Sequence, residues 1–393
     1  MPMQIHFIRT RRTWLAYLCL AYYSCLLNGL GPVLPFLRGE LHLSYAETSL
    51  QTTAFALGMA AVGLLGDQLI RRQGRRHTLV IGVCGLAFGS LLLVTARTFE
   101  FSLAGAFLMG SLGTLLLVLV PAMLADQHGE SRAVALNEAN TLASACALTV
   151  PLVVGALALT IFGWQTAYLL SALFLIFIAL QLRGLTLPSA PTSGPDHSSA
   201  TSLPAAYWAY WLLLVCCVSL EFSMIFWAAD FLHTASHVPK NAAAALVSVF
   251  FAAMVTGRFA GSRLARRFPA DLLLLPALAV TAVGFPIFWL GVSTPMRVAG
   301  LFVTGLGIAS LYPVVLSLAI GTVPDRSAAA SARATLASAT AIGVAPLVLA
   351  GLADHVGISK AYATIVVLLL LALLASRLAH RLTIVQPRIA VIP

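Results

Sequence analysis

The stretch GDQLIRR at residues 66–72 decides the fold, because a close copy, GSRLARR, follows 195 positions later at residues 261–267. Three further words recur in the same order at nearly the same spacing. They are TLASA of 141–145 at 335–339, Gly163, Ala167 and Tyr168 at Gly357, Ala361 and Tyr362, and Phe36-Leu37 at Phe231-Leu232. Short apolar words recur by chance in any hydrophobic chain, but four in one order at one spacing indicate duplication. The sequence therefore predicts two homologous halves.

The composition places both halves in a membrane. Of 393 residues, 60% are hydrophobic and only 9% are charged, whereas a soluble protein carries about 25% charged residues. The net charge of +10 does not indicate a nucleic-acid partner, because the basic residues stand in short clusters between apolar runs. The six cysteines lie inside those runs, without the spacing of a zinc or redox site. Lipid must therefore cover most of the surface.

Twelve apolar runs are long enough to cross a hydrocarbon core of about 30 Å, which needs roughly 20 helical residues. The predicted fold class is an all-α membrane protein with 12 transmembrane helices in two pseudo-symmetric six-helix bundles. The first run is predicted to be a span and not a signal peptide, since no A-x-A-like cleavage site follows it. The predicted spans are 13–36, 45–67, 77–96, 101–125, 134–160, 164–182, 206–232, 241–262, 270–292, 297–321, 328–352 and 359–378.

The two halves are predicted at 1–183 and 206–381. A Pro- and Ser-rich cytoplasmic linker at 184–205 joins them, and a cytoplasmic tail occupies 382–393. With both termini inside, 18 of the 23 basic residues fall on the cytoplasmic side and five on the outer side. Because cytoplasmic loops carry such an excess, we expect a multi-pass protein of the inner (plasma) membrane.

The loop GDQLIRRQGRR at 66–76, with its second copy after the eighth span, is similar to the glycine-and-arginine signature of the major facilitator superfamily. This resemblance covers nearly the whole chain. It implies two parallel repeats that rock about a central cavity lined mainly by helices 1, 4, 7 and 10, usually in a monomer. Arg71 stands where the signature usually has an acid. The fourth span also lacks the arginine found there in many proton-coupled drug exporters of the family.

Glu221 is the one carboxylate that the sequence places well inside the hydrocarbon zone. A charged side chain there costs about 2.5–3.5 kcal/mol on insertion scales, so it must face a cavity, find a partner or be protonated. We predict that Glu221 is the proton-coupling residue, neutralised by a proton before the loaded carrier reorients. The alternative is an acid that only holds helices together through hydrogen bonds.

Five polar and aromatic residues are candidates for contact with the solute. Asn28 stands 193 positions before Glu221, at the matching place of the first half, and its amide suits hydroxyls or amides. An interhelical hydrogen bond would explain it as well. Aromatic faces suit sugar rings, flat drugs and cations, although packing or a place at the headgroup belt is the alternative. The predicted set is Asn28, Tyr23, Trp227, Tyr312 and Asn140.

Other residues are candidates for hinges or gates in the change between the states open to either side of the membrane. Proline removes a backbone hydrogen bond and loosens a helix, and the prolines concerned stand beside or after glycines. The predicted hinge set, for which close packing is the alternative, is Gly31, Pro32, Pro121 and Pro313. The resemblance implies that basic loops brace the cytoplasmic ends of the halves, and topology alone is the alternative. Arg258 either gates the inner side or reaches the headgroups. The predicted gate set is Asp67, Arg71, Arg75, Asp126, Arg258 and Arg266.

These features predict a secondary active transporter that moves a small neutral, sugar-like or amphipathic solute together with protons. A polyanion is disfavoured, because the sequence places no Arg or Lys near the membrane midplane. Efflux of hydrophobic compounds by the same fold is the main alternative. An enzyme or receptor is disfavoured, since no nucleophile–base cluster, metal-ligand spacing, phosphate-binding loop or large soluble module stands out. The expected partners are solute, protons and lipid, with no metal, cofactor or nucleic acid.

Overall fold

The computed structural model describes residues 8–129, 132–170, 173–182, 203–265, 267–323 and 327–385, apart from some side chains within these ranges. Most of the predicted linker and the last residues of the predicted tail lie outside the described residues. So do Arg266 and the side chains of Asp67 and Arg71. The described residues form helices and turns with no strand, which confirms the prediction of an all-α protein.

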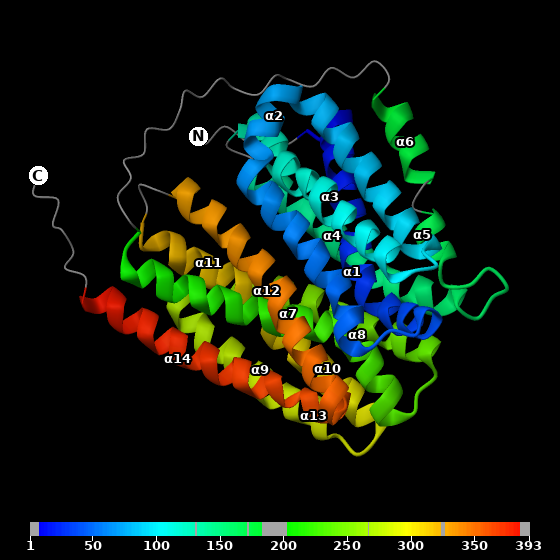
Figure 1. Ribbon diagram of the computed structural model, residues 1–393. Helices are drawn as coiled ribbons and strands as arrows, with labels where there is room; N and C mark the ends of the chain where they lie inside the picture. Colours follow the sequence, from blue (N-terminus) through cyan, green and yellow to red (C-terminus); the bar gives the residue numbers. More distant parts are fainter. Residues whose placement is uncertain are drawn as a thin grey trace, which may run out of the picture.

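Each half contributes a set of antiparallel helices (Figure 1). The first half contains α1 (Arg11–Leu41), α2 (Tyr45–Thr95), α3 (Phe99–His128), α4 (Arg132–Leu157), α5 (Thr166–Leu169) and α6 (Leu173–Leu182). The second half contains α7 (Ala205–Ser236), α8 (Lys240–Leu264), α9 (Ala270–Leu290), α10 (Thr294–Ile308), α11 (Leu311–Gly321), α12 (Ser327–Val356), α13 (Ile358–Ala361) and α14 (Ala363–Val385).

Eleven helical segments of the described chain are long and apolar enough to cross a membrane. Helix α2 supplies two of them, because the chain turns at Gly74, whose φ of 77° glycine adopts without steric cost. The tenth predicted span consists of α10 and α11 together. The sixth predicted span, 164–182, contains α5 and α6, and Thr166–Ile178 is a shorter apolar helix. The segments therefore match the twelve predicted spans in order.

Local sequence signals fix where the first helices begin and end. Thr10 and Ser44 are N-caps whose side chains accept from the backbone N–H three residues later, and Thr13 and Glu47 bond back to complete capping boxes. Between these helices, His42 adopts the left-handed conformation that ends α1, with φ 54°. Polar caps at both points are consistent with helix ends that lie outside the apolar layer.

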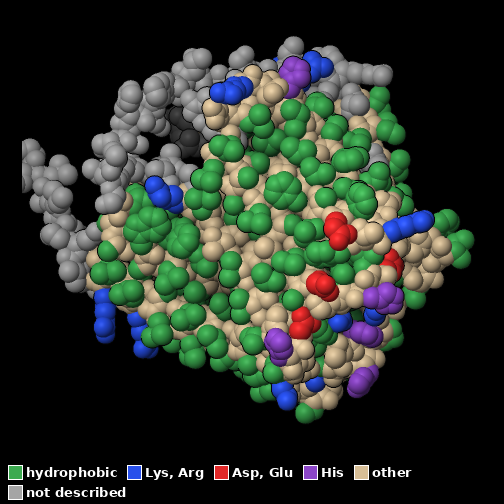
Figure 2. Space-filling model, viewed as in Figure 1, with side chains coloured by type: hydrophobic (Ala, Val, Ile, Leu, Met, Phe, Trp, Pro, Cys, Tyr) green, Lys and Arg blue, Asp and Glu red, His purple; other side chains and the backbone are tan. Residues whose placement is uncertain are grey.

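The bundle has two ends, named here after a residue at each. The His42 end contains the turns at 42–44, 96–98 and 237–239, and the Gly74 end contains the kink at Gly74 and the residues 267–269 that precede α9. Between the ends, large apolar side chains such as Leu64, Phe88 and Val283 are about 60% or more exposed. Figure 2 shows hydrophobic side chains filling a broad band, with charged ones gathered toward its two ends. This is the surface that lipid requires.

The halves meet along two flanks and one central crossing. Helix α2 packs along α12 on one flank, and α4 packs along α8 on the other. In the centre α1 crosses α7 so closely that a Cβ on Gly31 would lie 1.9 Å from the backbone oxygen of Ile225. Only glycine allows that approach.

Candidate functional site

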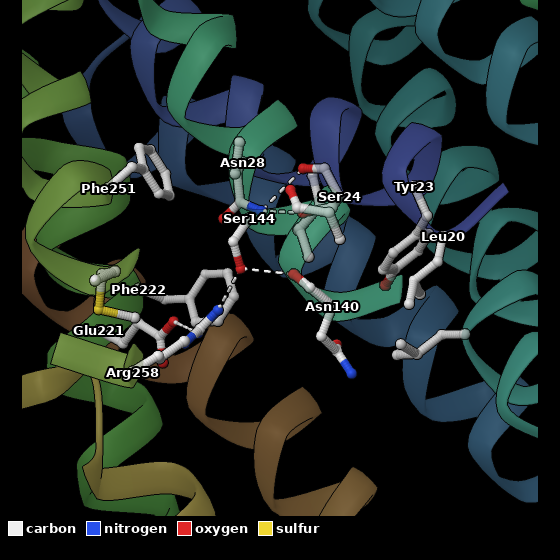
Figure 3. Close-up of a pocket in the computed structure, with 15 residues that line it drawn as sticks. Leu20, Tyr23, Ser24, Asn28, Asn140, Ser144, Glu221, Phe222, Phe251 and Arg258 are labelled. Carbon is white, nitrogen blue, oxygen red and sulfur yellow. Dashed lines mark hydrogen bonds and ion pairs between the residues drawn. The ribbon is translucent and has the colours of Figure 1, made fainter. Parts of the chain in front are cut away.

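A cavity of about 160 Å³ lies between the two halves, on the Gly74 side of the Gly31 crossing. Five helices line it: α1, α3 and α4 from the first half, and α7 and α8 from the second (Figure 3). Its lining residues are Leu20, Tyr23, Ser24, Leu27, Asn28, Leu117, Asn140, Ala143, Ser144, Ala147, Glu221, Phe222, Phe251, Met254 and Arg258. Apolar walls with a few convergent polar groups are typical of a small-molecule site.

An ion pair occupies one side of this cavity. Arg258 Nη2 lies 3.5 Å from Glu221 Oε1, and Arg258 Nη1 donates a hydrogen bond of 3.0 Å to Ser144 Oγ. The guanidinium therefore connects α8 with α7 in its own half and with α4 across the interface (Figure 3). The side chain of Glu221 is 14% exposed and that of Arg258 is 46% exposed.

The position of Arg258 corrects two predictions. Its side chain turns into the cavity and does not extend to the headgroups. The sequence predicted no Arg or Lys near the membrane midplane, where it placed Glu221. This prediction is wrong for Arg258, because its guanidinium reaches the carboxylate of Glu221. The sequence could not settle this, because a side chain with four rotatable bonds reaches a cavity or an interface equally well from one helical turn.

The Glu221–Arg258 contact is loose compared with another pair in the same chain. Arg9 binds Glu138 with two hydrogen bonds of 2.8 and 2.5 Å, and Tyr17 adds a third at 3.1 Å. Bidentate geometry of that kind is strong and specific. The single 3.5 Å contact in the cavity is at the limit of a hydrogen bond. The pair in the cavity is thus the one that a ligand or a proton can separate at lower cost.

Uncharged polar groups form the opposite side of the cavity. Asn28 donates to the backbone oxygen and the hydroxyl of Ser24, at 2.9 and 3.1 Å. The amide of Asn140 donates to the backbone oxygen of Leu136. Both side chains line the cavity, as the prediction for the solute site requires. Tyr23 also lines it, with its hydroxyl 3.3 Å from that of Thr114.

Trp227 and Tyr312 lie outside the cavity lining, contrary to the prediction. The ring of Trp227 is 1% exposed and packs 5.6 Å from that of Tyr45, and its Nε1 donates to the backbone oxygen of Pro346. Trp227 is therefore a packing residue between the halves. Pro121 lies inside α3 and Pro313 in the first turn of α11, and their role as hinges stays a prediction.

Polar contacts between the halves close the cavity toward the His42 end. Arg38 of α1 binds Asp230 of α7 at 2.6 Å, and its guanidinium lies 3.9 Å from the ring centre of Tyr45. Asp230 is completely buried. Lys240 Nζ contacts the backbone oxygen of Pro35 at 3.3 Å, again across the interface. These contacts lie beyond the Gly31 crossing. The crossing of α1 and α7 and the polar contacts of Arg38 and Lys240 therefore both separate the cavity from the His42 end.

A second contact at this end joins α12 to α2. The carboxylate of Asp354 accepts hydrogen bonds from the backbone N–H groups of Tyr45 and Ala46, at 2.7 and 2.9 Å. An anion at a helix N-terminus meets unpaired donors and the positive end of the helix dipole. Asp354 therefore caps a helix that belongs to the other half.

The predicted gate residues make contacts of two kinds: Arg258 bonds to Ser144 across the interface, whereas the pair formed by Arg75 stays within one half. Arg75 pairs with Asp126, which ties α2 to α3 in the first half. The prediction that the basic loops brace one half against the other needs correction for this pair. Arg9 with Glu138 likewise joins the chain before α1 to α4. These two ion pairs each join elements of the first half, whereas the Arg38–Asp230 pair at the His42 end joins the two halves.

Four residues of the site and its closure, namely Arg38, Asp230, Asp354 and Ser144, are not among the sequence predictions. The apolar run ends near residue 232, which groups Asp230 with acids at helix ends. The helix continues to Ser236, so Asp230 lies within the helix and is buried. The sequence did contain a signal for this pair. Arg38 and Asp230 lie at the same end of the first and seventh spans, which the repeat makes equivalent.

Comparisons with known proteins agree with the fold. The family model described as Major Facilitator Superfamily matches residues 16–214 and 211–388. The multidrug resistance protein MdtL of Escherichia coli is 28% identical over 176 residues, which cover 43% of this chain and 45% of MdtL. The match thus spans less than half the length of that relative.

Two further similarities cover nearly the whole chain. An uncharacterized MFS-type transporter of Yersinia pestis is 24% identical over 367 residues, 89% of this chain and 91% of that protein. The crystal structure of a bacterial homolog of the human lysosomal transporter Spinster, in an inward-facing and occupied conformation, superposes with a TM-score of 0.78 and 17% identity. It covers 94% of this chain and 96% of its own. At that identity the likeness shows a shared fold.

Proposed function

This chain belongs to the major facilitator superfamily, and from that premise we propose that it moves a small solute across the plasma membrane by alternating access, coupled to protons through Glu221. The observation that carries this proposal is the cavity between the halves. It holds an ionisable pair, and contacts between the halves close it toward the His42 end. Rocking of such halves about a central site is how this fold transports.

The proposal assigns a side of the membrane to each end. The excess of basic residues puts the Gly74 end in the cytoplasm. The Arg38–Asp230 pair and the Gly31 crossing then form the outer closure, and the described state is inward-facing. The Spinster homolog was crystallised in an inward-facing conformation and has the same fold, which supports the assignment.

The proton site is proposed on the geometry of Glu221. Its carboxylate is the acid of the cavity lining, it makes one long contact with Arg258, and it faces the interior of the site. A proton on Glu221 cancels one of the two charges of the pair. A charge is costly to move through the apolar layer. The protonation state of Glu221, which sets the net charge of the cavity, therefore decides which form of the carrier reorients.

Glu221→Gln tests the coupling. Glutamine keeps the shape of a protonated carboxyl but cannot release a proton. We expect proteoliposomes containing the variant to retain solute exchange and to show no more solute-driven proton movement than empty vesicles, measured with a pH-sensitive dye. Glu100→Gln, at an exposed acid at the start of α3, is the control and should behave as wild type. Proton movement that survives Glu221→Gln would refute this role.

Efflux of hydrophobic compounds is the second candidate. The similarity to MdtL, a protein named for multidrug resistance, favours it, as do apolar lining residues such as Leu27, Phe222 and Met254. Direction separates the candidates: an exporter should lower the toxicity of such compounds in cells that produce it, whereas an importer should raise uptake of a labelled nutrient. Arg258 in the cavity lining removes the argument against an anionic solute, and the neutral, sugar-like solute stays a prediction.

A further inference from the structure

The charges of the cavity lining restrict the solute. Arg258 and Glu221 are the two charged residues among the lining residues, so the lining is neutral while both are ionised. A guanidinium has five N–H donors in a planar fork. In the described part of the chain, Ser144 and Glu221 accept from Arg258, and the side chain remains 46% exposed. Its free donors suit an anion, which arginine binds in a bidentate manner.

Protonation of Glu221 unbalances this lining. Once Glu221 is neutral, the charge of Arg258 has no counterpart among the lining residues. A net charge on the lining is costly when reorientation carries the site through the apolar layer. A solute with one negative charge restores neutrality. The empty carrier with the ionised pair and the loaded carrier with a proton and an anion are both neutral, whereas either ligand alone leaves a net charge.

We propose that the solute is a small monoanion, such as a carboxylate, that binds Arg258 and crosses with one proton in an electroneutral cycle. This inference rests on the proposed function of Glu221 as the proton site. The proton moves from water to a carboxylate oxygen of Glu221 on one side and returns to water on the other, and no other bond changes.

The remaining lining fits a solute of that kind. About 160 Å³ equals the share of about five water molecules at about 30 Å³ each. Asn140 has one amide N–H beyond the one that Leu136 accepts, whereas both N–H groups of Asn28 bond to Ser24 in the described state. Leu20 and Phe251 line the cavity for the apolar part of the solute. A neutral solute would leave Arg258 unbalanced when Glu221 is protonated. A dianion would leave one negative charge in excess.

The other titratable groups near Glu221 do not replace Arg258. Cys217 belongs to the same helix, and Tyr312 of α11 is close enough to interact with the Glu221 charge. Tyr23 is the titratable residue that α1 adds to the lining, and its hydroxyl contacts Thr114. The lining residues from α3 and α4 carry no ionisable group. All of these groups are neutral when protonated, so Arg258 alone can supply a positive charge.

Binding is tested on the full-length protein in detergent with matched probes. Lactate, nicotinate and benzoate are compared with their amides, and stabilisation is followed as the rise in Tm. We expect at least one acid to bind and no amide to bind comparably. Its apparent affinity should fall by up to tenfold per pH unit as the pH rises, because one proton is taken up with the anion. Binding should be lost in Arg258→Gln and partly restored in Arg258→Lys.

Arg263→Gln, at an exposed arginine on the same helix that stacks on Phe259, is the matched control and should bind as wild type. The inference is overturned if an amide binds as well as its acid, if an acid binds Arg258→Gln undiminished, or if no acid in the panel binds.

Transport separates this inference from the function on which it rests. In proteoliposomes, an imposed membrane potential should leave the wild-type rate unchanged. Glu221→Gln should exchange labelled anion for unlabelled anion but show no net uptake, because its empty carrier bears the unbalanced charge of Arg258. If proton coupling survives in Glu221→Gln, the proposed function fails. If coupling is lost but the driven solute is neutral, only the monoanion inference fails.

Discussion

Arg38→Ala should shift the protein from the described state to one that is open at the His42 end. The variant leaves Asp230 buried without its positive partner, and the second carboxylate oxygen of Asp230 has no hydrogen-bond partner among the described residues either. Removing one member of a buried pair costs about 3–5 kcal/mol. Opening returns Asp230 to water and removes this cost. Since 1.4 kcal/mol corresponds to a factor of ten, the equilibrium should move by a factor of roughly one hundred to a few thousand.

Labelling from the outside measures that shift. Leu34 is 1% exposed on the closed side of α1, so a cysteine at position 34, in a background without the six native cysteines, should react with a membrane-impermeant maleimide much faster in Arg38→Ala. Arg97→Ala, at an exposed arginine of the same end, is the control. Replacing Asp230 with Asn in the same variant should reverse part of the effect, because no buried charge then remains. Unchanged labelling would show that the pair does not hold the closure.

Gly31→Leu should abolish transport by preventing closure at the same end. A Cβ at this position would lie 1.9 Å from the backbone oxygen and 2.7 Å from the carbonyl carbon of Ile225. Real Cβ atoms do not approach other atoms within 3.0 Å, and a backbone group cannot rotate away as a side chain would. Helices α1 and α7 must therefore separate. We expect solute exchange at the level of empty vesicles and strong labelling at position 34, with the protein still folded.

A matched substitution distinguishes a clash between halves from a clash inside one half. A Cβ on Gly110 would lie 2.0 Å from the backbone oxygen of Phe55, and both residues belong to the first half. Gly110→Leu should thus lower Tm because it disrupts the packing of α2 on α3, without a specific increase in labelling at position 34. If Gly31→Leu behaves like Gly110→Leu, the crossing contributes to stability and not to the change of state.

The sequence predicted the fold well because lipid allows few solutions. Only helices and closed barrels satisfy the backbone in an apolar layer, so apolar runs of about 20 residues locate helical spans, and the repeated words locate the halves. The ends of the helices were predicted less well. Helix α1 extends to Leu41 although the apolar run ends near residue 36, since polar residues can continue a helix beyond the membrane. The break between α10 and α11 at residues 309 and 310 lies one turn before Pro313, which the sequence marks as a bend because proline cannot donate to the carbonyl of residue 309.

The candidate site was predicted in part. Glu221 and Asn28 can be identified because polar residues are conspicuous in an apolar run, and both line the cavity. Arg258 stands out in the sequence, but its depth cannot be predicted there, because it depends on helix tilt and on a flexible side chain. Trp227 was predicted as a solute contact although its place near the outer end of the span favours packing, and the packing of Tyr45 on its ring is a tertiary contact that spacing cannot reveal.

The bond from Asp354 to the start of α2 has no twin in the duplicated structure. By the spacing that relates Gly163 to Gly357, Asp354 corresponds to Thr160, whose hydroxyl bonds within its own segment. The start of α8, which corresponds to that of α2, has no side-chain cap. At the His42 end a helix cap thus joins α12 to α2, whereas the described bond between α4 and α8, from Arg258 to Ser144, lies at the cavity. We expect the outer mouth to part first along α4 and α8, so that the halves twist about the α2–α12 edge and the solute enters off-centre.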